Sequence, residues 1–364
     1  MNICKIYRLL GGFKMINQEL LDKMTHEMVD NKHVFSTVFC VEDEKGSFSY
    51  TSAAGEMKAD DFYYIASVTK LYITAVVLIL KNKHQLNLDE KIINYFPDGY
   101  LDGLHIYQGV DYTHDITIKH LISNTSGIPD YFFGKDTHGQ SGADELLDGK
   151  DSIWSFEKTL SFVKNMKPKF KPGQKGKAEY SDTNYQLLGQ ILTAITGKEV
   201  GELFQTLLFK PLELKKTYIY CDPQDQKPAS MYYQKHILKV PLYMSSIASE
   251  GGIVSTAKEC MIFLKAFFGG FFFDPKELEA LQRWHFMLRP ATMYFGVGLE
   301  KLWTPWYITG GKSVSNILGF WGQTGSFAFY HQDSGLYFTG TANQINGRGH
   351  NAAYKAILKL IRQA

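Results

Sequence analysis

The chain has 364 residues, of which 45% are hydrophobic and 21% are charged, and its formal net charge is +2. This length exceeds one ordinary domain and is enough to bury a large core. The Lys and Arg residues are spread along the chain rather than clustered, so the charge pattern excludes a nucleic acid as partner.

Cysteine usage and the apolar segments indicate a protein that is neither exported nor inserted in a membrane. The four cysteines contain no Cys-x-x-Cys pair and have no His at ligand spacing, so we expect reduced thiols and no metal site: Cys4, Cys40, Cys221 and Cys260. The apolar run at 9–14 is too short for the core of a signal peptide, and the run at 71–80 is too short to span a bilayer. We therefore predict a cytoplasmic location with no membrane span.

The N-terminal part of the chain reads as one helix, two strands and a second helix. Apolar residues recur at helical spacing over 17–31, and strands joined by a turn are predicted over 34–41 and 47–53. A helix that is apolar on nearly every face begins at Ser67, and such a helix is a buried one.

The middle of the chain, from about 85 to 234, changes character. Its apolar spacing predicts helices separated by long polar loops, over 86–96, 116–122, 155–166, 184–195 and 200–208.

Strand signals return beyond about residue 250. A helix over 256–268 with Ser255 as its N-cap is followed by four strands and a closing helix, over 294–302, 316–321, 325–331, 336–342 and 351–362. Strands near both ends with helices between them predict an α+β fold, with one antiparallel sheet built from both termini and flanked by helices. We assign 15–84 and 235–364 to a discontinuous sheet domain and 85–234 to an inserted, mainly helical domain. Because pockets favour domain interfaces, we expect the active site between the two.

Ser67 and Lys70 form a Ser-x-x-Lys motif at the start of the buried helix. Residues three apart on a helix are neighbours, so a hydroxyl and an amine lie together, as nucleophilic acyl transfer requires. The spacing recurs at Ser155/Lys158, Ser161/Lys164 and Ser255/Lys258, and only the buried position of the Ser67 helix distinguishes the first match. The alternative role of Ser67 is that of a plain helix N-cap.

Two further motifs follow in the chain. One is the segment 179–189, which contains Tyr180-Ser181-Asp182, and the other is the segment 322–326, which contains Gln323-Thr324-Gly325. With Ser-x-x-Lys, they resemble the serine β-lactamase and penicillin-binding-protein superfamily. The most similar branch holds class C β-lactamases, D-alanyl-D-alanine carboxypeptidases and related esterases, whose members carry Ser-x-x-Lys, Tyr-x-Asn and Lys-Thr-Gly or His-Thr-Gly in this order. The segment 121–130 resembles the family's LLxHTSGLPD with Asn124 in place of His, and 250–257 resembles its AGGLVST turn.

The resemblance implies a β-lactamase/transpeptidase-like fold and an acyl-enzyme mechanism without metal or organic cofactor. Ser67 would attack the substrate carbonyl while Lys70 and Tyr180 carry protons, and the sequence leaves open which of the two is the acylation base. The backbone N–H groups of Ser67 and Ser326 would form the oxyanion hole, and Gly325 would let its strand approach the substrate.

Two departures from the family pattern bear on the substrate. Asp182 stands where penicillin-directed relatives usually have a donating Asn, and an ionised carboxylate can only accept; a helix N-cap is its alternative role. Gln323 stands where they have a cation, and Thr324 follows it as in the family. Both changes disfavour anionic substrates. Arg348 could supply the missing cation, because its region often lines the pocket in relatives.

These observations predict a serine acyl hydrolase of the β-lactamase-related type that acts on a small-molecule or peptide acyl substrate as an esterase or peptidase. One alternative is a class C-type β-lactamase or D-alanyl-D-alanine carboxypeptidase. A second is a non-catalytic ligand-binding sensor. The oligomeric state is not assigned.

Overall fold

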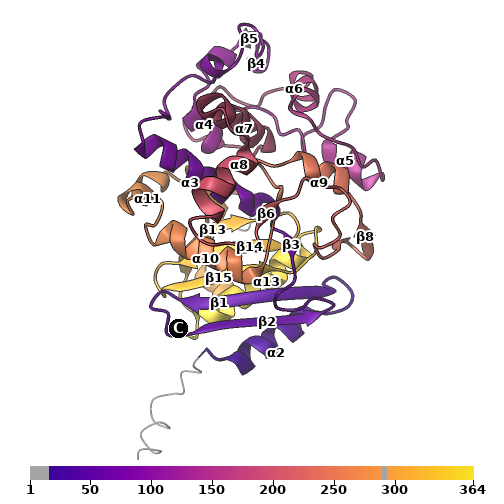
Figure 1. The fold of residues 1–364 in the computed structure, drawn as a ribbon, viewed down its shortest axis with the longest axis vertical. Coiled ribbons are helices and arrows are strands. Elements are labelled where there is room, and N and C mark those ends of the chain that lie inside the picture. The colour runs from indigo at the N-terminus through magenta and orange to yellow at the C-terminus, as the bar shows by residue number, and fades with distance from the viewer. Residues whose placement is uncertain (1–15, 289–292) are drawn as a thin grey trace, which may run out of the picture.

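A computed structural model describes residues 16–288 and 293–364 of the chain. The segment 1–15, on which the absence of an export signal was predicted and which includes Cys4, lies outside that part. Strands from both ends of the chain, indigo and yellow in Figure 1, lie together in the lower half of the molecule, and the middle of the chain lies above them.

The large sheet has eight antiparallel strands, and its order brings the two ends of the chain together. From one edge to the other the strands are β10 (His285–Leu288), β11 (Met293–Phe295), β12 (Glu300–Thr304), β13 (Val314–Trp321), β14 (Ser326–His331), β15 (Leu336–Thr341), β1 (Ser36–Asp43) and β2 (Ser49–Gly55). The N-terminal hairpin therefore joins the C-terminal strands through β1 and β15, where Val38 is opposite Thr341. This confirms the predicted antiparallel sheet built from both termini.

The sheet separates two apolar cores because neighbouring side chains of a strand point to opposite faces. On β1, Phe39 and Val41 belong to one core, which α2 (Gln18–Met28) and α13 (Arg348–Ile361) cover. Val38 and Cys40 belong to the other and larger core, which includes α10 (Ala257–Phe268). The second core continues into the helical half of the molecule, so one apolar interior connects the sheet to the helices.

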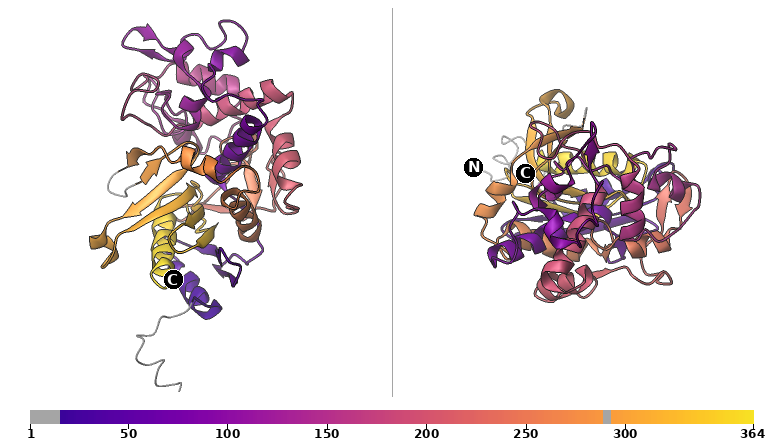
Figure 2. Two further views of the ribbon diagram at one scale, coloured as in Figure 1. Left: turned by 90° about the vertical axis from the view of Figure 1, so that its left-hand side faces the viewer. Right: turned by 90° about the horizontal axis from the view of Figure 1, so that it is seen from above.

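The helix that follows Ser67 is the central element of that interior. It comprises a 3-10 turn at Ala66–Val68 and α3 (Thr69–Asn82), and every residue from Thr69 to Leu80 is buried. The helices above it are α4 (Ile118–Ile122), α5 (Gly142–Leu147), α6 (Phe156–Lys164), α7 (Asp182–Thr196) and α8 (Val200–Phe204), which continues into a π-helical turn at Gln205–Phe209. Figure 2 shows these two halves of the molecule from two further sides.

Two predicted elements are wrong, in each case because of contacts with a distant part of the chain. The segment 86–96 forms only a short 3-10 turn, Ile92–Tyr95, because its backbone bonds across to the chain before α4, with Lys91 opposite Thr117. The predicted strand 294–302 is two strands, β11 and β12, because Gly298 turns the chain at φ +64° against α3. A Cβ at Gly298 would lie 2.1 Å from Thr74 Oγ1, so only glycine fits this close approach.

Several elements were not expected from the sequence. They are the helices α5, α9 (Pro241–Ser246), α11 (Lys276–Leu281) and α12 (Trp306–Thr309), the small sheet of β3 (Tyr63–Tyr64), β9 (Ile253–Ser255) and β6 (Tyr218–Ile219), and the hairpins β4 (Ile106–Tyr107) with β5 (Val110–Asp111) and β7 (Met231–Tyr233) with β8 (His236–Leu238). Ser255 ends β9, and Thr256 is the N-cap of α10 in its place.

The division into two domains remains a prediction. The β7–β8 hairpin crosses the boundary expected between residues 234 and 235, and β6 pairs with β9 of the sheet half. We therefore propose that the helical insert ends before β6.

The apolar features of the chain are mostly internal. In the aromatic run 267–273, Phe267 and Phe273 are buried, whereas Phe271 is exposed.

Cys40 and Cys260 are free and buried, and burial raises the pKa of their thiols to about 12 and about 11. Within 16–288 and 293–364, no helix combines the length and apolar character needed to cross a bilayer.

Candidate active site

Ser67 lies in the 3-10 turn at the start of α3, where β14 meets the helix. Its neighbour Ala66 has φ +46°, a backbone conformation that L-residues rarely adopt outside sites held by their surroundings. Two hydroxyls, from the first residue of β14 and from the turn before it, hold the preceding backbone: Ser326 Oγ donates to Ile65 O at 2.6 Å, and Thr324 Oγ1 donates to Tyr64 O at 2.7 Å. The Ser67 hydroxyl is thus presented from a backbone that another strand holds in place.

Lys70 is one turn further along α3 and is wholly buried. Its Nζ lies 2.9 Å from Ser67 Oγ, 2.7 Å from the carbonyl oxygen of Glu250 and 2.6 Å from Asp182 Oδ1. An ammonium group has three N–H donors and no acceptor, and three acceptors surround this nitrogen. The Ser67 hydroxyl and the Lys70 amine are therefore in contact, as predicted, and the Asp182 carboxylate lies beside the amine.

Tyr180 is the third group at the nucleophile. Its hydroxyl lies 2.7 Å from Ser67 Oγ and 3.1 Å from Asp182 Oδ1. The loop that carries it is held on both sides by Asn124, whose backbone oxygen accepts from Glu179 N and whose Oδ1 accepts from Ser181 N. Burial, and then the charge of Asp182, raise the pKa of Tyr180 well above its ordinary value, so the phenol keeps its proton.

Asp182 has a different position from the one expected. It is the first residue of α7, after Ser181 at the N-cap position, so the N-cap role does not apply. Its side chain is only 9% exposed and forms the ion pair with Lys70. It also lines the pocket, so contact with a substrate stays a prediction, whereas contact with Lys70 and Tyr180 is observed.

Further buried carboxyl groups surround this centre, and the sequence analysis did not single out any of them. Glu250 lies where the family segment AGGLVST has Ala, and its side chain accepts from Tyr131 OH, Gln186 Nε2 and Ser249 Oγ. Burial raises the pKa of Glu250 and Asp130 to about 7, in each case assisted by the charge of Asp182, and burial raises that of Glu300 to about 8. The replacement of Ala by Glu250 was the available signal.

The Gln323-Thr324-Gly325 motif lies at one wall of the pocket, which Gln323 and Thr324 line. Gln323 lines the pocket close to Ser67, and its Nε2 donates to Ile345 O at 3.2 Å. Gly325 has φ +78°, which favours glycine, and a Cβ there would lie only 3.1 Å from the Gln344 backbone; a close approach of this strand to a substrate stays a prediction. Ser326 is buried behind the wall, and its backbone contribution to an oxyanion hole stays a prediction.

Arg348 lies outside this site, contrary to the sequence-based expectation. It is exposed at the start of α13 and lines a separate groove with Met28 and Lys355. The residues on either side, Gly347 and His350, do line the active-site pocket. The side chain of Arg348 points elsewhere because position 348 begins a helix whose buried face covers the other side of the sheet.

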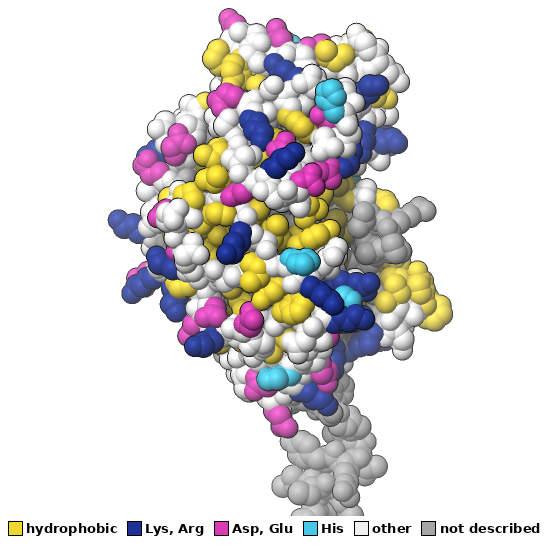
Figure 3. Space-filling view, turned by 90° about the vertical axis from the view of Figure 1, so that its right-hand side faces the viewer, with side chains coloured by type: hydrophobic (Ala, Val, Ile, Leu, Met, Phe, Trp, Pro, Cys, Tyr) yellow, Lys and Arg dark blue, Asp and Glu magenta, His cyan; other side chains and the backbone are white. Residues whose placement is uncertain are grey.

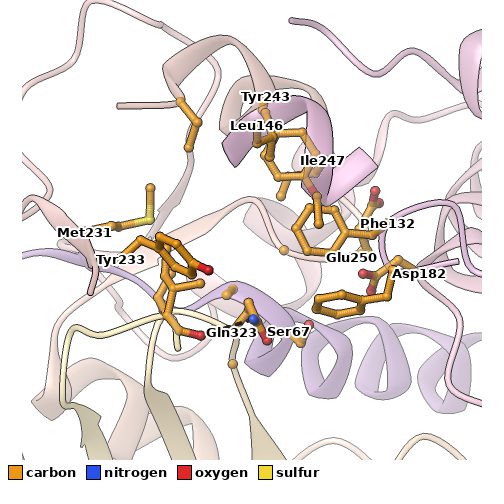
Figure 4. A pocket seen from close by; sticks show the side chains of 18 of the residues that line it. Ser67, Phe132, Leu146, Asp182, Met231, Tyr233, Tyr243, Ile247, Glu250 and Gln323 are labelled. Carbon is orange, nitrogen blue, oxygen red and sulfur yellow. Dashed lines mark hydrogen bonds between the residues drawn. The ribbon is translucent and has the colours of Figure 1, made fainter. Parts of the chain in front are cut away.

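The pocket above Ser67 is large and mostly apolar. Its volume is about 760 Å³, and one lobe is formed by side chains of α5, α9 and the β7–β8 hairpin, including Leu146, Tyr243, Ile247, Met231 and Tyr233. Figure 4 shows these side chains around an open space, with Ser67 and Gln323 at its base. Apolar side chains also gather across the middle of the face shown in Figure 3.

The ionisable groups of the pocket are mainly acidic. Asp182, Glu250 and Glu300 line it, and among the described lining residues the sole Lys or Arg is Lys135, which is paired with Asp144. In the described part of the chain, no three His, Cys, Asp or Glu side chains are placed to hold a metal ion together.

The chain is similar to known proteins along most of its length. Residues 21–361 match the family model described as Beta-lactamase. Penicillin-binding protein 4* of Bacillus subtilis (strain 168) is 26% identical over 205 residues, which are 53% of this chain and 40% of that protein. A putative D-alanyl-D-alanine carboxypeptidase of Salmonella agona (strain SL483) is 24% identical over 328 residues, which are 80% of this chain and 67% of that protein.

The fold has a clear match among solved structures. A D-stereospecific amidohydrolase from Streptomyces sp. superposes with a TM-score of 0.77 at 21% identity, covering 94% of this chain and 99% of that one. This likeness confirms the predicted β-lactamase/transpeptidase-like fold. Three curated relatives are matched over 27–40% of their own lengths, so the chain spans less than half of each of them.

Proposed function

The chain belongs to the Beta-lactamase family, and on that premise we propose that it is a serine acyl hydrolase that cleaves uncharged esters or amides with a bulky apolar group. One observation carries the proposal: the Ser67 hydroxyl lies within 2.9 Å of Lys70 Nζ and 2.7 Å of Tyr180 OH, at the base of a pocket of about 760 Å³. A nucleophile with two proton-carrying groups in hydrogen-bond reach is the arrangement that an acyl-enzyme mechanism requires.

The apolar lobe supports a bulky apolar group on the substrate. Burial of apolar surface contributes about 25 cal/mol per Å², so a hydrocarbon or aromatic group in a lobe lined by residues such as Leu146, Tyr243 and Met231 binds favourably. Short acyl groups would leave this lobe to water.

The charge of the site supports an uncharged substrate over an anionic one. A substrate carboxylate would approach the ionised Asp182 and would find Gln323 where penicillin-directed relatives have a cation. An unpaired carboxylate in a partly desolvated cleft costs free energy. Arg348 lies outside the pocket, so its charge does not offset this cost. This pocket therefore favours neutral acyl substrates over penicillins or peptides with a free C-terminus.

A panel of substrates tests the proposal. We expect kcat/KM to be highest for neutral p-nitrophenyl esters, to rise from acetate to octanoate as the acyl chain fills the apolar lobe, and to be lower for nitrocefin and for a D-Ala-D-Ala peptide. If nitrocefin or the peptide is hydrolysed with a higher kcat/KM than every neutral ester, the β-lactamase or carboxypeptidase alternative replaces this proposal. If no substrate is turned over and Ser67 forms no adduct with a fluorophosphonate, the sensor alternative replaces it.

Gln323→Lys tests the charge argument directly. A lysine at this position places a cation beside the substrate, and a partly exposed pair contributes about 1 kcal/mol or less. We expect kcat/KM for anionic substrates to rise by up to about fivefold, with little change for neutral esters. Gln323→Met is the control, because it has a similar length and no charge. An equal change in both variants would contradict the electrostatic explanation.

A further inference from the structure

Asp182 gives the acylation step a proton acceptor that neither the Ser-x-x-Lys motif nor Tyr180 supplies. We propose that, in the reaction assigned above, the proton of Ser67 passes through the Tyr180 hydroxyl to the Asp182 carboxylate, while Lys70 remains an ammonium. This inference rests on the proposed function, since it describes how Ser67 becomes acylated.

The surroundings of Lys70 argue against its being the acceptor. Its nitrogen has three acceptors within 2.9 Å, Ser67 Oγ, Glu250 O and Asp182 Oδ1, which is one for each proton of an ammonium. The contact of 2.6 Å with Asp182 Oδ1 is a charge-assisted hydrogen bond that uses one of these N–H groups. In this state Lys70 has no lone pair for the Ser67 proton, and its N–H instead points at Ser67 Oγ, where negative charge develops.

The geometry of Tyr180 provides the alternative route. Its oxygen is 2.7 Å from Ser67 Oγ and 3.1 Å from Asp182 Oδ1, and a phenol has a single proton to donate. When that proton is directed to Asp182, the phenolic oxygen is free to accept from Ser67. The three groups then form a continuous path, from hydroxyl to phenol to carboxylate.

The step balances as a double proton transfer. The Ser67 Oγ–carbon bond forms as the carbonyl electron pair moves to the carbonyl oxygen. The Ser67 proton moves to the Tyr180 oxygen, and the Tyr180 proton moves to Asp182 Oδ1. When the tetrahedral intermediate collapses, the leaving group takes a proton from Tyr180, and Asp182 returns its proton to Tyr180, so that both groups recover their starting state.

Other ionisable groups face this centre from every element around it. The tyrosines keep their protons, because burial raises their pKa values well above the ordinary range: Tyr131, Tyr185 and Tyr243, as for Tyr180. Burial raises the pKa of Glu300 on β12 to about 8, so Glu300 is mainly neutral at pH 7. Asp130 and Glu250, with pKa values raised to about 7, are partly neutral there. In the described part of the chain, none of these three carboxyl groups hydrogen-bonds to Tyr180 or Ser67, whereas Asp182 contacts both Tyr180 and Lys70.

The rate of Ser67 labelling by a fluorophosphonate as a function of pH tests the relay without a natural substrate. In the intact chain, labelling should slow only at acidic pH, where a carboxylate can no longer serve as proton acceptor. In Asp182→Asn the relay ends in an amide that takes no proton, so the Ser67 proton must leave to hydroxide or another base from solution. Because general acid–base catalysis contributes about 10²–10⁴-fold, we expect labelling of this variant to be at least about a hundredfold slower near pH 6. That deficit should shrink as pH is raised.

Two further variants and a control make the result decisive. Tyr180→Phe interrupts the relay. Its labelling should likewise be slow near pH 6 and should recover as pH is raised. Asp182→Glu keeps a carboxylate and should retain the shape of the profile of the intact chain. Asp98→Asn removes an exposed carboxylate far along the chain from the site and should leave the profile unchanged.

The outcomes separate this proposal from the one on which it rests. Asp182→Asn that labels at the rate of the intact chain, or that is slowed equally at every pH, would overturn the relay while leaving Ser67 as the nucleophile. If the intact chain is not labelled at Ser67 at any pH, the proposed function fails, and the relay with it.

Discussion

Ser67→Ala is expected to lower ester turnover by about 10³-fold or more, because it removes the atom that forms the acyl-enzyme. Lys70, Tyr180 and Asp182 keep their contacts with one another in this variant, so the fold should persist. Intact-mass analysis after fluorophosphonate treatment should show one adduct on the intact chain and none on the variant.

Ser161→Ala is the matched control for this experiment. Ser161 also lies three residues before a lysine on a helix, α6, but its side chain is exposed and it does not line the pocket. Turnover and labelling should be unchanged. An adduct that maps to Ser155, Ser161 or Ser255, or a Ser67→Ala variant with near-normal turnover, would contradict the assignment of the nucleophile.

Lys70→Met is expected to reduce both turnover and stability. Turnover should fall by about a hundredfold or more, because the cation beside Ser67 is lost. Stability should fall because the ion pair is buried: the side chain of Lys70 is 0% exposed and that of Asp182 is 9% exposed. Removing one partner of a buried ion pair leaves an uncompensated charge and costs about 3–5 kcal/mol, which urea denaturation followed by circular dichroism can measure.

A double variant identifies the source of that loss. Lys70→Met combined with Asp182→Asn removes both charges, so most of the lost stability should return while turnover stays low. Lys158→Met is the control: Lys158 also belongs to a Ser-x-x-Lys match, but its partner Glu145 and its own side chain are about one-third exposed, and such pairs contribute about 1 kcal/mol or less. A double variant as unstable as Lys70→Met would show that lost packing, rather than unpaired charge, is responsible.

The sequence predicted the groups around the nucleophile because their relation is local or carried by a motif. Ser67 and Lys70 are one helical turn apart, so any helix that begins there brings them together. Tyr180 could be placed beside them only through the family resemblance, since no local rule relates positions so far apart. The sheet built from both termini was likewise predictable, because strand signals occur near both ends of the chain and helical signals lie between them.

The tertiary structure alone decided which groups these residues contact. Asp182 pairs with Lys70 because α7 starts beside α3. Arg348 lies outside the pocket because position 348 begins α13 on the far side of the sheet. The apolar lobe combines α5, α9 and the β7–β8 hairpin, which were not predicted as elements. These features depend on contacts between distant segments, whereas local spacing records only which face of its own helix or strand a residue occupies.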